Sequence, residues 1–130
     1  EANKYLKELD ADFDATAEMG TLSVAQQQMV EIAKALSTNA KIIILDEPTV
    51  GLDPQQIIEI RTLIRDLARQ HTVILSSHIL SEVQQMADTI GIICGGRLAY
   101  EDALRPRQDL EELFMSVCRE GRRARGEVAA

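Results

Sequence analysis

Apolar residues first recur at helical spacing and then gather in short continuous runs. From residue 25, apolar side chains fall at i, i+4, i+7, i+8 and i+11, on one face of a helix: Ala25, Met29, Ile32, Ala33 and Leu36. Ser23 followed by Gln26 matches the S-x-x-Q capping box, which predicts that this helix begins there. Asn39 is a suitable residue to end it.

Two runs rich in β-branched residues follow, at 41–45 (KIIIL) and 72–77 (TVILSS). Such runs are typical of strands buried on both faces of a parallel sheet. Gly51 and Pro54 bracket a loop after the first run. A second amphipathic helix is then indicated by Ile57, Ile60, Ile64, Leu67 and Ala68. Strand, helix and strand form a βαβ unit, so the sequence predicts an α/β fold.

The ends of the chain carry weaker patterns. A short helix around residues 5–9 precedes an acidic connector, and the C-terminal part predicts a helix, a hairpin and a last helix at 80–87, 89–100 and 110–117. Gly95 and Gly96 predict the hairpin turn, and Asp109 predicts the cap of the last helix.

Charge and length restrict the function classes. The 130 residues include 14 basic and 21 acidic side chains, a net charge of −7, which argues against a nucleic-acid partner. The one basic cluster, REGRRARG near the C-terminus, predicts a solvated tail, with a docking patch for an acidic surface as the alternative. No apolar run approaches the length of a membrane-spanning helix, so we expect a soluble chain.

The two cysteines, Cys94 and Cys118, are far apart in sequence and have no CxxC motif or histidine at ligand spacing. This spacing indicates neither a zinc site nor a disulfide framework, and it predicts reduced thiols. The N-terminal residues show no secretory signal pattern.

Polar residues with possible chemistry follow both predicted strands. Asp46 and Glu47 end the first strand, and His78 follows the second. The C-terminal ends of parallel strands share one edge of a sheet. There, one carboxylate can orient Mg²⁺ through its waters, a second can polarise water for phosphoryl transfer, and an imidazole can donate a hydrogen bond to the transferred group. Either feature alone is also compatible with a solvated loop and a surface histidine.

Four segments in order resemble the ATP-binding cassette (ABC) transporter ATPases. They are LSVAQ (22–26), IIILDEPT (42–49), GLDP (51–54) and SSH (76–78), which are similar to the signature motif, Walker B, D-loop and switch-histidine loop of that family. The resemblance implies ATP and Mg²⁺ as ligands and a P-loop NTPase (RecA-like) parallel sheet with flanking helices.

The resemblance also implies roles for individual residues. Asp46 would belong to the magnesium shell, Glu47 would be the catalytic base, His78 would sense the γ-phosphate, and Asp53 would contact a second cassette. The γ-phosphate of an ATP held by the partner cassette would be bound by Ser23, Val24, Ala25 and Gln26. A serine-capped helix N-terminus is independently suited to anions, because its N–H groups and dipole are positive.

The chain departs from the family pattern by lacking the phosphate cradle G-x-x-x-x-G-K-[ST]. The nearest segment, GIICGGRL at 91–98, has Arg97 and Leu98 where Lys and Ser/Thr belong, and it continues as a strand pattern. A cradle must instead open a helix, so this match is false. The resemblance therefore covers only the C-terminal half of a cassette, whose missing central strand would pair beside residues 72–77 and leave an open edge.

Two further departures concern residue types. Ala25 stands where the family signature usually has glycine, and its methyl group is expected to weaken cross-cassette ATP binding. The signature region resembles the sugar-import branch of the family, whereas the segment after residues 46–49 resembles the branch serving ABC-2 type exporters. A recombined or constructed gene is one explanation.

These observations divide the chain into a remnant of a helical subdomain with its connector (1–21), the C-terminal half of an ABC ATPase domain (22–118) and a disordered basic tail (119–130). The leading hypothesis is a fragment of an ATP-hydrolysing subunit that neither binds nor hydrolyses ATP alone. The alternatives are a non-catalytic interaction module that completes its sheet with a partner or with itself, and an engineered or recombined fragment.

The expected partners follow from the same resemblance. They are a second cassette or the missing N-terminal half, and, for a full-length parent, a transmembrane permease. A homo-oligomer is also possible through the open sheet edge. The resemblance places the chain in the cytoplasm and its parent at the inner face of a membrane.

Overall fold

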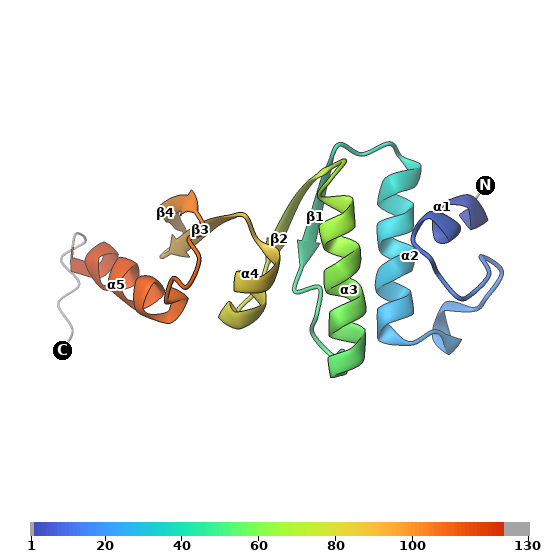
Figure 1. The fold of residues 1–130 in the computed structure, drawn as a ribbon, viewed down its shortest axis with the longest axis horizontal. Helices are drawn as coiled ribbons and strands as arrows, with labels where there is room; N and C mark the ends of the chain where they lie inside the picture. The colour runs from blue at the N-terminus through green and yellow to red at the C-terminus, as the bar shows by residue number, and fades with distance from the viewer. Residues whose placement is uncertain (1, 124–130) are drawn as a thin grey trace. The chain divides into compact units, whose positions relative to one another are not determined.

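The computed structural model describes residues 2–123, which divide into two compact units at the bond between His78 and Ile79. The first unit contains α1 (Ala2–Glu8), the 3₁₀ turn η1 (Met19–Thr21), α2 (Val24–Ser37), β1 (Ile42–Asp46), α3 (Pro54–Leu67) and β2 (Thr72–Ser76) (Figure 1). The second contains α4 (Leu80–Met86), β3 (Thr89–Cys94), β4 (Arg97–Ala103) and α5 (Leu110–Arg123).

The centre of the first unit is the predicted βαβ unit. Strands β1 and β2 pair in parallel, with Ile42 opposite Thr72 at one end and Asp46 opposite Ser76 at the other. Helix α3 makes the crossover between them. The pairing confirms the α/β prediction, and it places the residues after both strands at the same edge.

Helices cover one face of this sheet. In Figure 1, α3 and α2 stand side by side next to the strands, and α1 lies against α2. The core cluster comprises Leu6, Leu9, Ile32, Ala33 and Leu67, and Leu45 and Val73 from the strands pack against it. Burial of these apolar side chains is the main stabilising contribution, at about 25 cal/mol for each Å² removed from water.

The other face of the sheet is open, which corrects the prediction of strands buried on both faces. Ile42, Ile44 and Ile74 are 59%, 73% and 52% exposed, whereas Ile43 is only 3% exposed. Successive strand residues point to opposite faces, and within the first unit helices cover only one of them. The continuous apolar run is typical of strands with a covering layer on each face, and the helices of the first unit supply one such layer.

Helix boundaries in this unit follow side-chain caps. Helix α2 begins after Ser23, whose hydroxyl accepts from the Gln26 amide while Gln26 Oε1 accepts from the Ser23 amide, as predicted. Helix α3 begins at Pro54, at the end of the predicted loop, because Asp53 forms a second capping box with Gln56. Proline suits this first helical position, since its missing N–H has no intrahelical acceptor there.

The second unit contains the predicted hairpin and final helix. Gly95 and Gly96, at φ 57° and 73°, form the turn between antiparallel β3 and β4, so the segment 91–98 is a hairpin and no phosphate cradle. Asp109 Oδ1 caps α5 by accepting from the Glu112 amide at 3.0 Å. The helix continues to Arg123, so the first residues of the expected basic tail are helical; residues 124–130 lie outside the described part.

The prediction of reduced thiols is wrong for this structure. Cys94 and Cys118 form a disulfide, with their Cα atoms 5.6 Å apart. Cys94 ends β3, and α5 folds back along the hairpin, which brings Cys118 beside it. Sequence spacing did not reveal this contact, because it depends on how helix and hairpin pack.

Within residues 2–123, no helix combines the length and apolar character required to cross a membrane.

Asp14 is expected to titrate below its ordinary pKa of 3.8. The backbone N–H of Thr16 lowers the pKa of Asp14 most, followed by the Thr16 hydroxyl and the Asn3 amide, because all three donate to the ionised carboxylate. A lowered folded-state pKa means that this contribution to stability is present above the unfolded-state pKa and is lost as pH falls through the folded-state pKa. Carboxyl-carbon NMR titration of the chain and of Asn3→Ala should show the Asp14 pKa rising in the variant. An equal pKa in both proteins would contradict the assignment.

Candidate functional site

The last residues of β1 and β2 carry a connected polar cluster. Asp46 and Ser76 are directly opposite in the parallel register, and the Ser76 hydroxyl donates a hydrogen bond to Asp46 Oδ1. Side chains two residues apart on a strand share a face, so Asp46 lies on the same face as Ile44, and Ser76 on the same face as Ile74. Both polar residues therefore stand at the end of the open face. The bond engages one of the two Asp46 oxygens and leaves Oδ2 for another ligand.

Glu47 is held in a backbone conformation that side-chain-bearing residues rarely adopt. Its φ is +46°, in the left-handed region. Its amide donates to the Ser76 carbonyl at 3.1 Å, which continues the strand pairing one residue past the end of β1. Backbone strain of this kind is found at functional sites where surrounding bonds enforce it.

The two oxygens of the Glu47 carboxylate have different surroundings. Oε1 accepts from the His78 backbone amide at 3.1 Å and lies 2.8 Å from His78 Nδ1. Oε2 is buried and has no hydrogen-bond partner in the described part of the chain. A buried carboxylate oxygen without a donor is costly, so this oxygen has a strong preference for a hydrogen-bond or metal partner.

The contact between His78 and Glu47 restricts the imidazole. A neutral ring that donates from Nδ1 to Glu47 has an accepting Nε2, and Nε2 can donate only if the ring is doubly protonated or the tautomer changes. The His78 side chain is 72% exposed, so Nε2 is accessible for such a partner. The prediction that Asp46, Glu47 and His78 lie together at one edge is confirmed by these contacts.

The N-terminus of α2 forms a separate part of the candidate site. The side chains of Ser23 and Gln26 each accept a hydrogen bond from the other residue's backbone amide, and Gln26 Nε2 also donates to Asp12 at 2.9 Å. The first amides of a helix, here those of Val24 and Ala25, have no acceptor within the helix. Ala25 is buried, so its methyl group packs inside the unit. This arrangement provides two backbone donors and an accessible serine at the positive end of a helix dipole.

The loop between β1 and α3 is the third predicted part. Gly51 has a φ of +79°, and a Cβ at its position would lie 4.0 Å from a Val24 methyl carbon, so this loop lies against the start of α2. Asp53 caps α3 through the Gln56 amide. No hydrogen bond in the described chain joins Ser23 or Asp53 to the cluster of Asp46, Glu47 and His78.

The cluster offers few metal ligands of its own. Among the residues that the structure describes, no group of three or more His, Cys, Asp or Glu side chains is placed to hold a metal ion. Asp46 Oδ2 is nevertheless a hard oxygen donor that Ser76 does not engage. Such a donor fits Mg²⁺, which keeps several waters and takes further oxygens from phosphates.

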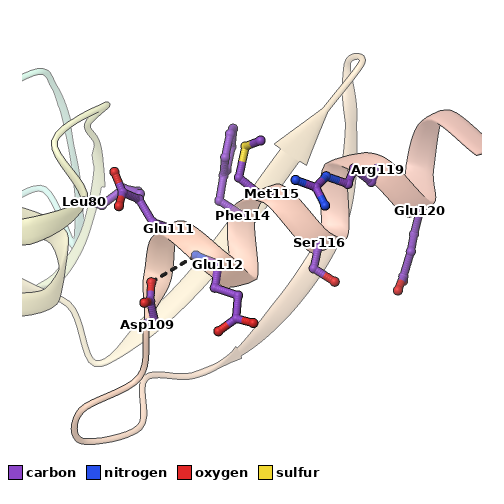
Figure 2. A pocket seen from close by; sticks show the side chains of 9 residues that line it. All are labelled: Leu80, Asp109, Glu111, Glu112, Phe114, Met115, Ser116, Arg119 and Glu120. Atoms are coloured by element: carbon purple, nitrogen blue, oxygen red, sulfur yellow. Dashed lines mark hydrogen bonds between the residues drawn. The ribbon is translucent and has the colours of Figure 1, made fainter. Parts of the chain in front are cut away.

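A surface hollow of about 860 Å³ lies in the second unit and contains none of the predicted site residues. Figure 2 shows Phe114 and Met115 beside each other on α5, with four carboxylates among the lining residues: Asp109, Glu111, Glu112 and Glu120. Arg119 also lines the hollow, but the four carboxylates outnumber it and repel phosphate, so the hollow is poorly suited to a phosphate. The cluster at the ends of β1 and β2 remains the candidate site.

Sequence comparisons point to one family. A sequence profile described as "ABC transporter" matches residues 1–50. The xylose import ATP-binding protein XylG of Geobacillus kaustophilus is 39% identical over 121 residues, which is 92% of this chain and 24% of XylG. The galactose/methyl galactoside import ATP-binding protein MglA of Escherichia coli K12 is 42% identical over 98 residues, 75% of this chain and 19% of MglA.

The chain belongs to the ABC transporter ATPase family. It spans about a quarter or less of the length of these curated relatives.

Solved structures agree with the fold. A nucleotide-free ATP-binding cassette from an ABC transporter matches with a TM-score of 0.74 and 26% identity, over 99% of this chain and 49% of that one. A dimeric cassette in a post-hydrolysis state with ADP and phosphate matches with a TM-score of 0.64 and 30% identity, over 80% and 46%. These matches confirm the predicted partial P-loop NTPase fold.

Sequence reasoning missed Ser76 as part of the site. The residue was grouped only with the histidine loop, yet it contacts both Asp46 and Glu47. The signal that could have found it is the strand register, because the two runs pair with Asp46 opposite Ser76.

The left-handed backbone at Glu47 predicts an unusual order of stability. Glu47→Gly should be more stable than Glu47→Ala by about 1 kcal/mol, because both lose the carboxylate but only glycine adopts positive φ without strain. Urea unfolding of both variants measures the difference.

Glu31, exposed in the middle of α2, provides the matched control. There Glu31→Ala should be more stable than Glu31→Gly by about 1 kcal/mol, as in an ordinary helix interior. Alanine more stable than glycine at both positions would show that Glu47 is not strained.

Proposed function

We propose that residues 22–78 carry the hydrolytic half of an ABC-type ATP site. The observation that carries this proposal is the Glu47 carboxylate, which His78 holds through Oε1 at the strand end next to Asp46, and whose Oε2 has no hydrogen-bond partner among the described residues. An oxygen so placed can accept a proton from the water that attacks the γ-phosphate. Family membership supplies the reaction class.

Each residue of the cluster then has a distinct task. Asp46 would hold Mg²⁺ through Oδ2, and the bound ion supplies positive charge to the phosphate oxygens. Glu47 Oε2 accepts the proton of the attacking water. His78 Nε2 donates to the γ-phosphate when the ring is doubly protonated, while Nδ1 keeps its contact with Glu47.

The N-terminus of α2 would serve the ATP of a partner cassette. Ser23 and the amides of Val24 and Ala25 are donors at a positive helix end, and Gln26 fixes the serine by the capping box. The buried Ala25 methyl group does not point into solvent before the helix, which reduces the expected crowding of a phosphate. Asp53 would contact that cassette from the loop before α3.

The wider assembly is proposed from the relatives. XylG and MglA are named as import ATP-binding proteins, and one similar structure is a dimer of cassettes. We place the parent of this chain at the cytoplasmic face of a membrane, with a second cassette and a permease. These 130 residues contain no G-x-x-x-x-G-K-[ST] segment, so ATP must be anchored by other residues.

Titration and a chimera test this proposal together. Calorimetric titration of the isolated chain with Mg-ATP should show no saturable micromolar binding, because the anchoring loop is absent. In the chimera, the matched part of this chain replaces the corresponding 98-residue stretch of E. coli MglA. The chimera should hydrolyse Mg-ATP, with the rate lowered about 10²- to 10⁴-fold by Glu47→Gln and about 10²-fold or more by His78→Ala.

The control is Thr72→Ala, which removes a hydroxyl from the opposite end of β2 and should leave the chimera's rate unchanged. A folded chimera that binds ATP but whose rate is insensitive to Glu47→Gln would contradict the proposed base. Saturable binding by the isolated chain would reveal a phosphate site that the sequence does not show.

A second candidate function, association through the sheet with a partner chain or a second copy, is favoured by the open face and the unpaired edges of β1 and β2. Ile42, Ile44 and Ile74 form an exposed apolar row on a parallel pair, an architecture usually covered on both faces. Both strands also have one unpaired edge in the described chain.

Sedimentation velocity over a range of concentrations tests this candidate. If the open face mediates self-association, Ile44→Lys should shift the chain toward monomer. Ile58→Lys, which places the same charge on an exposed isoleucine of α3, should not. A wild-type chain that is monomeric at high concentration excludes the homo-oligomer.

A further inference from the structure

Ser76 makes hydrogen bonds to both residues that carry the proposed chemistry. Its hydroxyl donates to Asp46 Oδ1, and its backbone carbonyl accepts from the Glu47 amide at 3.1 Å. The same amide lies 3.4 Å from the hydroxyl oxygen, a longer second contact. A hydroxyl can make the two side-chain contacts together, because it is one donor and two acceptors.

We propose that Ser76 is a positioning residue, which fixes the Asp46 carboxylate and the Glu47 backbone before any ligand binds. This inference rests on the proposed function, because the oxygens that Ser76 would orient are the metal-binding oxygen of Asp46 and the proton-accepting oxygen of Glu47. Ser76 itself touches no reacting atom in this account.

The geometry gives the hydroxyl a specific task. An exposed aspartate side chain exchanges among its χ1 rotamers and also rotates about its soft last bond, so Asp46 would otherwise sample many orientations. The bond from Ser76 engages Oδ1 and thereby directs Oδ2 away for a cation. The register makes this contact possible, since Ser76 is the residue paired with Asp46. Outer partners of a metal-binding carboxylate commonly affect cation affinity by 10- to 100-fold.

The backbone of Ser76 acts on Glu47. The carbonyl and the hydroxyl converge on the Glu47 amide, at the residue with φ of +46°. Holding this amide maintains the turn that sends the Glu47 carboxylate to His78. A residue at position 76 without a hydroxyl keeps the bond from its backbone carbonyl to the Glu47 amide. It loses both hydroxyl contacts, to Asp46 Oδ1 and to the Glu47 amide.

The test compares Ser76→Thr with Ser76→Val in the full 130-residue chain. Both replacements are β-branched and suit a strand, and only threonine keeps the hydroxyl. Thr72→Val is the matched control, since Thr72 occupies the same face at the other end of β2. NMR measures the χ1 couplings of Asp46 and the exchange rate of the Glu47 amide proton, without metal or nucleotide.

We expect Asp46 to have the couplings of one rotamer in the wild type, in Ser76→Thr and in Thr72→Val, and averaged couplings in Ser76→Val. The Glu47 amide should exchange about fivefold faster in Ser76→Val, as expected for loss of roughly one hydrogen bond. Equal couplings and exchange rates in the threonine and valine variants would overturn the proposal.

A second probe separates this inference from the proposed function. Mn²⁺ alone should broaden the amide signals of Asp46 and Glu47, and Ser76→Val should require about tenfold more Mn²⁺ than Ser76→Thr. If Mn²⁺ broadens neither signal in the wild type, the proposed metal role of Asp46 fails. The χ1 couplings of Asp46 then decide by themselves whether Ser76 is a positioning residue. If Mn²⁺ acts equally on both variants, Ser76 does not position the metal-binding oxygen.

Discussion

The parallel pairing of β1 and β2 is the constraint on which the candidate site depends. The register sets Asp46 opposite Ser76, and the next amide along, that of Glu47, donates to the Ser76 carbonyl. His78 then follows two residues after Ser76 and meets the Glu47 carboxylate with both its backbone amide and its ring. Because side chains alternate along a strand, a shift of β2 by one residue would turn the Ser76 side chain to the opposite face, away from Asp46.

The site combines local strain with incomplete hydrogen bonding. Glu47 has a left-handed backbone, and one of its oxygens is buried without a partner. Both features cost stability, and the helices behind the sheet offset that cost by burying the core residues of α1, α2 and α3. On the opposite face, exposed isoleucines show where a further layer would fit. The same face ends in Asp46 and Ser76, so the exposed apolar row leads directly to the candidate site.

Local sequence signals predicted most of the fold. The helix at Ser23, the βαβ unit and the glycine hairpin depend on capping, periodicity and turn residues, which act over a few positions. The errors concern contacts between distant segments. The disulfide between Cys94 and Cys118 forms only because α5 packs on β3. The exposure of one sheet face depends on which segments cover the two strands, and the residues of the strands themselves do not show this. Asp46, Glu47 and His78 were predicted together because parallel strands end at one edge, whereas Ser76 needed the register itself.

The most direct test of this account is the register of the two strands in solution. A NOESY spectrum of the labelled chain should contain a strong cross-peak between the amide proton of Glu47 and the α proton of Ser77, the residue after the acceptor carbonyl of Ser76. That result would place Asp46, Glu47, Ser76 and His78 in one cluster. A cross-peak from the Glu47 amide proton to the α proton of Leu75, Ser76, His78 or Ile79 instead would show a shifted pairing and contradict the site described above.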